Sequence, residues 1–239
     1  GEEFCIVPFE EEADVYVINT CTVTGKSDYR SRQAIRRAVR KNGDAYVIAT
    51  GCYSQVDPQA VASLKGVDLI LGNAEKLRIS GHLRDLRKSP RPTISVGDIG
   101  ACAEFLSAPI DTFPGYTRAF IKVQDGCDFR CSYCLVSTAR GPNRSEMPQK
   151  VIDQAEKLAR AGYGELVLTG VHLGGYGADL GGKNNLSGLL EALQEVEGIK
   201  KIRLSSIEPG EITDELIETM AASPKICHHL HIPMQSGDD

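Results

Sequence analysis

Short apolar, β-branched runs alternate with longer amphipathic stretches in the first part of the chain. The apolar runs lie at residues 13–19, 45–50 and 67–71, and the helix-like stretches lie at residues 27–41, 57–64 and 73–87. Asp57 suits a helix cap and Pro58 a first helical turn. Strand alternating with helix predicts an α/β fold with a doubly wound parallel sheet, flavodoxin-like in its class.

A different pattern begins after a proline-rich stretch. Residues 89–116 hold four prolines and show no sustained periodicity, so they are expected to be a linker. Strands are then expected at residues 118–123, 165–169, 201–204 and 228–232, with helices at 149–161, 186–195 and 214–222. This order predicts an incomplete βα barrel. The expected domains are therefore 1–88 and 117–239, joined by 89–116.

Composition places the chain among ordinary globular proteins, with 41% hydrophobic and 25% charged residues. No run of 18 apolar residues occurs, so no membrane-spanning helix is expected, and no signal peptide is recognisable. With neither an initiator Met nor a closing element, we expect a fragment of a longer cytoplasmic protein. The eight unevenly spaced cysteines favour metal-binding thiolates in a reducing compartment over a disulfide framework.

Three cysteines share one loop after the first strand of the expected barrel. Cys127, Cys131 and Cys134 have the spacing C-x-x-x-C-x-x-C. Three thiolates can hold three irons of a 4Fe–4S cluster and leave the fourth iron open to a ligand. A structural zinc site is the alternative, but it needs four ligands and the loop offers neither a second cysteine pair nor a histidine.

Cys21 and Cys52 each follow an expected strand of the first domain. The carboxyl ends of parallel strands meet at one sheet edge, so these thiols are candidates for a shared metal site. The alternative is two unrelated small residues in turns. Cys5, Cys102 and Cys227 are expected to be structural or incidental.

Basic residues are concentrated in one expected helix. Residues 26–41 carry seven Lys or Arg and one Asp, although the whole chain has a net charge of −5. Arg32, Arg36 and Arg40 are spaced to form one stripe. The stripe is either a nucleic-acid footprint or a solvated helix face.

The cysteine loop, with Tyr133 before its last cysteine, resembles the signature of the radical S-adenosylmethionine (SAM) superfamily. The resemblance implies that the open iron binds SAM, whose reductive cleavage yields a 5′-deoxyadenosyl radical. It also implies that the second domain is an incomplete radical SAM barrel.

Asn19-Thr20-Cys21-Thr22 and Thr50-Gly51-Cys52 resemble the methylthiotransferase branch of this superfamily. That resemblance implies a second 4Fe–4S cluster, held by Cys21, Cys52 and a third cysteine upstream of residue 1. Two clusters are therefore expected in the full-length protein, and one complete cluster site in this chain.

Residues 20–28 and 168–180 are similar to those of bacterial enzymes that methylthiolate N6-threonylcarbamoyladenosine in tRNA. Isopentenyladenosine in tRNA and a ribosomal-protein aspartate are the alternative substrates of the family. Residues 140–145 also match the family, but Glu146 stands where an Arg is usual, which puts a basic role there in doubt.

The resemblance further implies a SAM pocket at the strand ends. Its expected residues are Tyr133, Thr169, Gly170, Ser205, Ser206, Glu208 and Gln235. Histidines at strand ends, such as His172, are interpreted as ordinary hydrogen-bonding residues.

The expected partners are tRNA, an electron donor such as flavodoxin or ferredoxin, and a sulfur donor. Two other interpretations are a non-catalytic zinc-binding RNA module and a flavodoxin-like nucleotide-binding protein. No Gly-rich phosphate loop follows the strands, which disfavours the latter.

Overall fold

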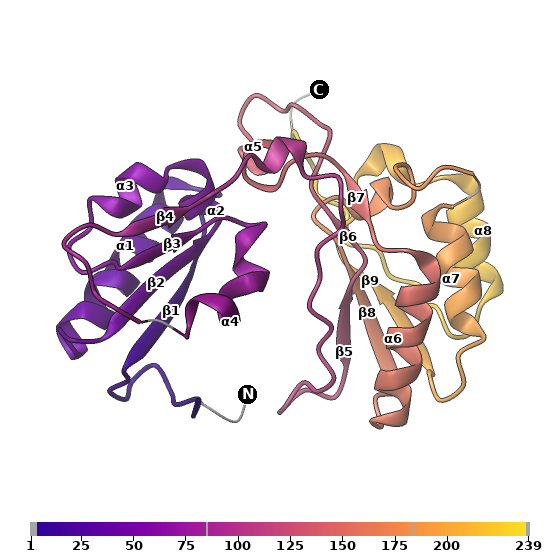
Figure 1. Cartoon of the computed structure of the whole chain (residues 1–239). Helices are drawn as coiled ribbons and strands as arrows, with labels where there is room; N and C mark the ends of the chain where they lie inside the picture. The colour runs from indigo at the N-terminus through magenta and orange to yellow at the C-terminus, as the bar shows by residue number, and fades with distance from the viewer. Residues whose placement is uncertain (1–3, 85, 183, 238–239) are drawn as a thin grey trace. The chain divides into compact units, whose positions relative to one another are not determined.

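The computed structural model describes residues 4–84, 86–182 and 184–237, and it divides into two compact units (Figure 1). Unit 1 contains the chain up to Cys102 together with Arg130–Arg140, and unit 2 contains Ala103–Phe129 and the chain from Gly141 onward. This division differs from the expected domains in two places. The expected linker is shared between the units, and an eleven-residue segment of the expected second domain clusters with the first.

Unit 1 is built on sheet A, a parallel sheet in the order β1-β2-β3-β4. Its strands are β1 (Val15–Thr20), β2 (Tyr46–Gly51), β3 (Leu69–Leu71) and β4 (Thr93–Ser95). The first three confirm the strands expected from the apolar runs. The fourth lies inside the expected linker, where it pairs with β3 in parallel.

Helices cover both faces of sheet A. On one face lie α1 (Gly25–Lys41) and α3 (Pro58–Ala62), and on the other lies α4 (Ile79–His82). Unit 1 also contains α2 (Cys52–Val56), the 3₁₀ turns η1 (Glu75–Arg78) and η2 (Ile99–Ala101), and α5 (Val136–Arg140), which packs on α2 and η2. The Thr24 side chain caps α1 by accepting from the Ser27 N–H. Ile35 and Ala38, three residues apart on one face of α1, are fully buried against the sheet.

Alternate residues of the strands pack into two separate cores, as the period of a strand requires. Val47 and Ala49 of β2 face the core that α1 and α3 cover, whereas Tyr46 and Ile48 face the core that includes Ile79 of α4. The predicted doubly wound arrangement is thus present. The helix expected at residues 73–87 is reduced to η1 and α4.

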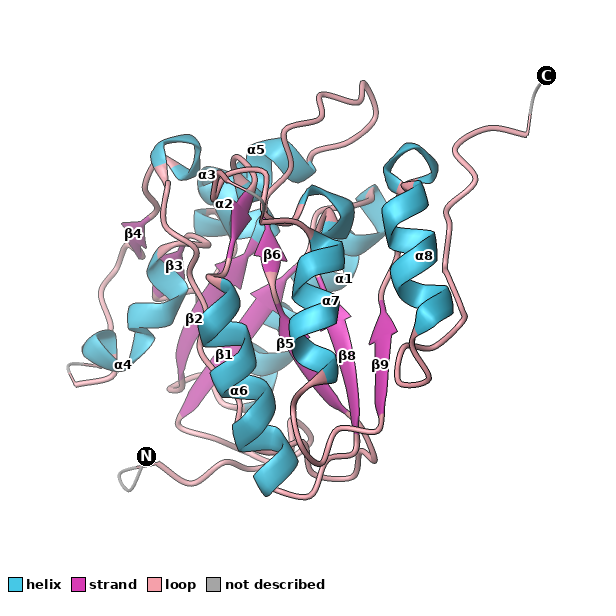
Figure 2. Ribbon diagram, turned by 90° about the vertical axis from the view of Figure 1, so that its right-hand side faces the viewer, coloured by secondary structure: helices cyan, strands magenta, loops and turns pink. Residues whose placement is uncertain are grey.

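Unit 2 is built on sheet B, with the parallel order β5-β8-β9. Its strands are β5 (Ala119–Lys122), β8 (Glu165–Thr169) and β9 (Lys201–Leu204). The helices of the unit are α6 (Pro148–Arg160), α7 (Leu186–Gln194) and α8 (Asp214–Ala222), and two 3₁₀ turns, η3 (Leu173–Gly175) and η4 (Pro209–Glu211), follow β8 and β9. The three helices lie side by side along the strands (Figure 2). Their apolar faces and the strands share one core, which is the arrangement expected of part of a βα barrel.

The strand expected at residues 228–232 does not form, and that prediction was wrong. Only isolated parallel bridges, Ile202 with Ile226 and Ser206 with His231, continue the sheet beyond β9. A tight turn, in which the His229 N–H donates to the Cys227 carbonyl at 2.7 Å, interrupts the ladder between them.

A two-stranded antiparallel sheet completes unit 2. It pairs β6 (Gln124–Asp125) with β7 (Arg144–Ser145). Because β6 leads into the cysteine loop, this sheet places residues 144–145 beside the start of that loop. No helix in the described part of the chain is long and apolar enough to cross a membrane.

Candidate functional site

Cys21 and Cys52 follow matched positions on neighbouring strands of unit 1. The register of β1 and β2 pairs Thr20 with Gly51, and each cysteine is the next residue. Both therefore leave the sheet at its carboxyl edge, as the sequence predicted, although Cys52 begins helix α2 rather than a loop. The carboxyl edge is where open α/β sheets bind ligands.

Gly51 is required by the close approach of the two strand ends. Its φ is +98°, and a Cβ at this position would lie 2.3 Å from the Thr20 carbonyl oxygen. The Thr20 hydroxyl donates to the Thr50 carbonyl at 2.6 Å and accepts from the Ser54 N–H at 3.2 Å. The Thr-Gly-Cys turn is thus locked to the end of β1, so the position of Cys52 depends on that of β1.

Helix α1 holds the backbone of Cys21 in place. The hydroxyl of Ser31 accepts from the Cys21 N–H at 3.1 Å and donates to the Cys21 carbonyl at 3.2 Å. The side chain of Cys21 is exposed. The backbone is therefore fixed while the thiol faces solvent.

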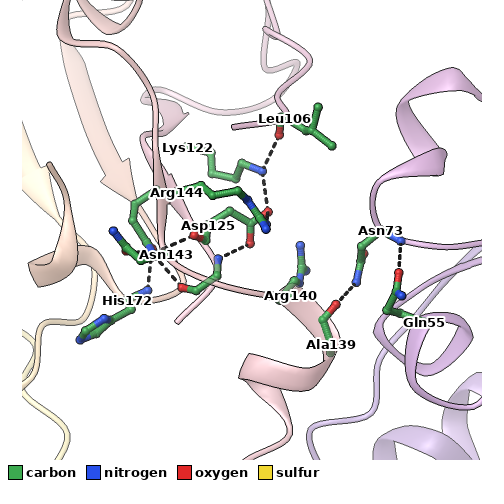
Figure 3. A network of polar contacts seen from close by, with 12 residues as sticks. Gln55, Asn73, Leu106, Lys122, Asp125, Ala139, Arg140, Asn143, Arg144 and His172 are labelled. Carbon is green, nitrogen blue, oxygen red and sulfur yellow. Dashed lines mark hydrogen bonds and ion pairs between the residues drawn. The ribbon is translucent and has the colours of Figure 1, made fainter. Parts of the chain in front are cut away.

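Two nitrogen donors lie near the sulfur of Cys52. Arg140 Nε lies 3.2 Å from Cys52 Sγ, and Asn73 Nδ2 lies 3.8 Å from it. Asn73 Nδ2 also donates to the Ala139 carbonyl at 2.8 Å, and the Asn73 N–H donates to Gln55 Oε1 at 2.8 Å (Figure 3). Sequence reasoning did not place Asn73 and Arg140 beside Cys52, from which they are 21 and 88 residues distant along the chain.

The cysteine loop begins on a constrained turn of unit 2. Gly126 has φ +77°, and a Cβ there would lie 1.8 Å from the Pro142 carbonyl oxygen. The Cys127 N–H donates to the Gly141 carbonyl at 3.0 Å. Gly126 thus allows the strand that precedes Cys127 to touch the segment that returns from the loop.

The rest of the loop belongs to unit 1. The Cys134 N–H donates to the Cys131 carbonyl at 3.0 Å, and Cys134 Sγ accepts from the Val136 N–H at 3.4 Å. Cys127 and Cys134 are half-buried, and Cys131 is exposed.

Their joint binding of a metal stays a prediction. Among residues 4–84, 86–182 and 184–237, no three His, Cys, Asp or Glu side chains form a group that could hold a metal ion. The donor chemistry nevertheless fits an iron–sulfur cluster, because three cysteines on one loop supply three soft sulfur ligands.

Gln124 fastens the start of the cysteine loop to two other segments of unit 2. Its fully buried side chain donates to Asn143 Oδ1 and to the Gly126 carbonyl, both at 2.7 Å, and accepts from the His172 N–H at 2.7 Å. No signal in the sequence marks Gln124, since a polar residue at a strand end is unremarkable.

Asp179 ties residues 140–146 to residues 168–180. Its carboxylate accepts from the Ser145 N–H at 2.8 Å, the Ser145 hydroxyl at 2.6 Å and Asn143 Nδ2 at 2.9 Å. The buried Tyr176 hydroxyl donates to the Glu146 carbonyl at 2.9 Å, and burial, aided by the Glu146 and Asp179 charges, raises the pKa of Tyr176. The two segments that match the family in sequence are therefore one hydrogen-bonded structure.

The expected SAM residues of β8 contribute mainly backbone. Thr169 Oγ1 donates to the Ile121 carbonyl at 3.2 Å, and the Thr169 carbonyl accepts from the Val123 N–H at 2.9 Å. A Cβ on Gly170 would lie 2.8 Å from Gln124 Oε1. Gly170 thus keeps the backbone close to the buried amide.

The expected SAM residues after β9 all have polar side chains. Ser205 Oγ is buried without a hydrogen-bond partner in the described part of the chain. Ser206 Oγ lies 2.6 Å from His231 Nδ1, and Gln235 Nε2 donates to Glu208 Oε2 at 2.8 Å. The structure therefore brings Glu208 and Gln235 together at this strand end.

Tyr133 is not part of that group. It lies in unit 1 with its side chain 75% exposed, whereas the other expected SAM residues lie in unit 2.

A buried acid–base pair lies at the same strand ends and was not expected. His172 Nε2 forms an ion pair with Glu211 Oε1, and both side chains are largely buried. Burial raises the pKa of Glu211, although the His172 charge opposes the shift. The His172 ring also contacts the Phe129 ring, with centroids 4.5 Å apart, so the pair touches a residue of the cysteine loop.

The basic stripe on α1 is only partly free. Arg32 Nη1 donates to the Tyr53 hydroxyl at 3.3 Å and its guanidinium lies 5.9 Å from the Tyr53 ring centre, which places Arg32 beside the residue after Cys52. Arg36 and Arg40 are exposed.

Glu146 accepts from the Ser107 hydroxyl at 3.1 Å and lies 3.5 Å from Lys150 Nζ. The acidic side chain is therefore accommodated by local partners within unit 2.

Two family descriptions match the chain. The Uncharacterized protein family UPF0004 matches residues 1–72, and the Radical SAM superfamily matches residues 121–239. The radical SAM methyltransferase TsrM from Kitasatospora setae, whose structure holds cobalamin and a [4Fe-4S] cluster, has a TM-score of 0.60 at 18% identity, over 91% of this chain and 49% of that one. This likeness supports the fold.

Curated relatives match nearly the whole chain. The threonylcarbamoyladenosine tRNA methylthiotransferase MtaB of Bacillus subtilis is 46% identical over 97% of the chain and 51% of the relative, and that of Aquifex aeolicus is 43% identical over 98% and 57%. The ribosomal protein uS12 methylthiotransferase RimO of a Roseiflexus strain is 33% identical over 96% and 53%. The chain thus spans about half the length of these relatives. The two family matches and these relatives show that the chain belongs to the radical SAM methylthiotransferase family.

Proposed function

We propose that the chain is the catalytic part of an enzyme that methylthiolates carbon 2 of N6-threonylcarbamoyladenosine next to the anticodon of tRNA. The observation that carries this proposal is the 46% and 43% identity, over nearly the whole chain, to two relatives named for that reaction. In the net change, the hydrogen on carbon 2 is replaced by sulfur that carries a methyl group from SAM.

Cys127, Cys131 and Cys134 are proposed to hold the radical-generating 4Fe–4S cluster. Held by these three cysteines, such a cluster would supply the electron for reductive cleavage of SAM and thereby the radical chemistry of the reaction. The constrained turn at Gly126 and the buried Gln124 amide hold the start of the loop. These residues position the first ligand before any cofactor binds.

The ends of β8 and β9 are proposed to bind SAM. The unpartnered, buried hydroxyl of Ser205 supports this assignment, because a buried polar atom without a partner is costly unless a ligand satisfies it. The exposed Ser206 and the Glu208–Gln235 pair offer acceptors and donors for sugar hydroxyls. Thr169 and Gly170 supply backbone groups, and Tyr133 lies next to a cluster ligand.

Cys21 and Cys52 are proposed to be two of the three ligands of the auxiliary cluster. Their support is the register of β1 and β2, which places both at one sheet edge. In this family the second cluster is the one linked to sulfur insertion.

The remaining partners follow from the chemistry. The reaction needs a one-electron donor such as flavodoxin or ferredoxin and a source of sulfur. A tRNA substrate places the enzyme in the cytoplasm.

Cationic residues of α1 are proposed to contact tRNA phosphates. A triple variant, in which Gln replaces Arg32, Arg36 and Arg40, is expected to bind tRNA more weakly. The slope of the logarithm of the binding constant against the logarithm of salt concentration should fall in magnitude by up to about 3, near one for each lost phosphate contact. Binding to tRNA at several salt concentrations measures this. Because Arg32 also contacts Tyr53, the Arg36→Gln, Arg40→Gln pair is the cleaner variant, with an expected loss of about 2.

Arg91 provides a control for net charge in that experiment, because it is an exposed arginine of unit 1 outside α1. The variant Arg91→Gln should leave the slope unchanged. An equal slope for the stripe variants and the parent would show that the stripe is only a solvated face.

The proposed substrate is tested by mass spectrometry of nucleosides from tRNA of cells that lack the full-length protein. The 2-methylthio form of N6-threonylcarbamoyladenosine should disappear and return with the plasmid-borne gene. Loss of 2-methylthio-isopentenyladenosine instead, or of the modified aspartate of uS12, would replace the proposed substrate. Zinc without iron in the purified protein would favour the RNA-binding module.

A further inference from the structure

One short helix contacts the sulfur atoms of two proposed ligands that belong to different clusters. The Val136 N–H at the start of α5 donates to Cys134 Sγ at 3.4 Å, and Arg140 at its end places Nε 3.2 Å from Cys52 Sγ. Both contacts lie within unit 1. The helix α5 thus joins a radical-cluster ligand to an auxiliary-cluster ligand.

Asn73 fixes the end of that helix and faces the same sulfur. Its side-chain nitrogen donates to the Ala139 carbonyl at 2.8 Å and lies 3.8 Å from Cys52 Sγ. Asn73 is 6% exposed, and its own N–H is bound to Gln55 Oε1, so its amide has little freedom to turn away. The side chain of Asn73 therefore both binds the backbone of α5 and places a nitrogen donor near the Cys52 sulfur.

We infer that Arg140 and Asn73 are positioning residues that donate hydrogen bonds to the Cys52 sulfur and thereby raise the reduction potential of the auxiliary cluster. This inference rests on the proposed function, in which Cys52 is a cluster ligand. Hydrogen bonds to the sulfurs are among the features that set cluster potentials. A donor near a ligating thiolate stabilises the added negative charge of the reduced cluster, and a cationic donor does so more strongly than a neutral one.

The guanidinium of Arg140 is suited to this role. It stays charged at any physiological pH, and its Nε–H is held in a planar group whose direction follows from the side chain. Arg140 is half-buried and ends α5, where a cation also interacts favourably with the helix carbonyls. The charged guanidinium of Arg140 is thus held close to Cys52 instead of extending into solvent.

The test uses the full-length enzyme with Cys127, Cys131 and Cys134 all replaced by Ala, so that any iron belongs to the auxiliary site. In this background we compare the parent with Arg140→Gln and with the control Arg91→Gln, an exposed arginine of the same unit. Iron is measured first, and the ratio of reduced to oxidised cluster is then measured by EPR during a redox titration.

At a fixed ambient potential, Arg140→Gln is expected to lower that ratio about tenfold, the effect of losing one hydrogen bond to a charged group. The control should match the parent. Should the Gln variant lose its iron, Arg140→Lys retains the charge and is expected to shift the ratio in the same direction by less.

An unchanged ratio in an Arg140 variant that retains its iron would overturn the inference and leave the proposed function intact. A parent protein without iron would instead overturn the assignment of Cys52 and, with it, the auxiliary cluster. Asn73→Ala should lower the ratio as well, by less than Arg140→Gln, because its donor is neutral and lies farther from the sulfur.

Discussion

Replacing any one of Cys127, Cys131 and Cys134 with Ala is expected to reduce reductive SAM cleavage to background in the full-length enzyme. A cluster with two thiolates is labile, and the three cysteines are the ligands that the loop offers. The effect should be similar at all three positions. Their contacts differ, since Cys127 and Cys134 make backbone hydrogen bonds to different segments, so equal losses would indicate a shared role as ligands.

The measurement is the yield of 5′-deoxyadenosine after anaerobic reconstitution with iron and sulfide, alongside the iron content. Cys5→Ala is the matched control, because Cys5 is an exposed free cysteine outside both proposed sites. It should retain the parent's yield and iron. Yields near that of the parent from all three loop variants would refute the radical SAM assignment of this loop.

Replacing Cys21 or Cys52 with Ala in the full-length enzyme is expected to remove about half of the iron, from about eight to about four per chain. Methylthiolation of tRNA should stop, whereas SAM cleavage should continue. The two activities separate because the proposed radical cluster uses a different set of cysteines.

Iron and sulfide analysis, 5′-deoxyadenosine assay and nucleoside mass spectrometry on the same samples distinguish the two functions. Cys227→Ala is the control here, since Cys227 is a free cysteine near the end of unit 2. A double variant at Cys21 and Cys52 that kept all its iron and still modified tRNA would show that these cysteines hold no cluster.

Strands and helices with strong apolar patterns could be predicted from the sequence. The expected strand at residues 165–169 coincides with β8, and the amphipathic stretch at residues 27–41 lies within α1. The buried positions of α1 repeat with the period of a helix, whereas β8 is a short continuous apolar run, as in a strand buried on both faces, so local sequence contains the information. The same holds for the sheet edge that carries Cys21 and Cys52.

Elements that depend on distant partners were missed. Strand β4 has three residues and lies close to Pro90 and Pro92, so its pairing with β3 is not apparent in its own sequence. The expected strand at residues 228–232 has a suitable apolar pattern, but the turn at Cys227–His229 competes with the sheet. Pattern alone cannot weigh such a turn against a ladder.

The candidate site shows the same limit. The loop cysteines could be proposed as ligands because their spacing is local, whereas Gln124, Asp179 and Glu211 act through partners 19 to 48 residues away. Each is an ordinary polar residue in its own segment. Only the folded chain reveals that it closes a loop or forms a buried pair.

The inclusion of α5 in unit 1 also limits how this protein can be divided. A polypeptide ending at residue 116 would lack Arg130–Arg140, although these residues pack on α2 and η2. The side-chain amide of Asn73 would then lose its acceptor at Ala139. The first unit is therefore not encoded by an uninterrupted stretch of the gene, and an isolated N-terminal half is expected to be less stable unless an equivalent of α5 is attached to it.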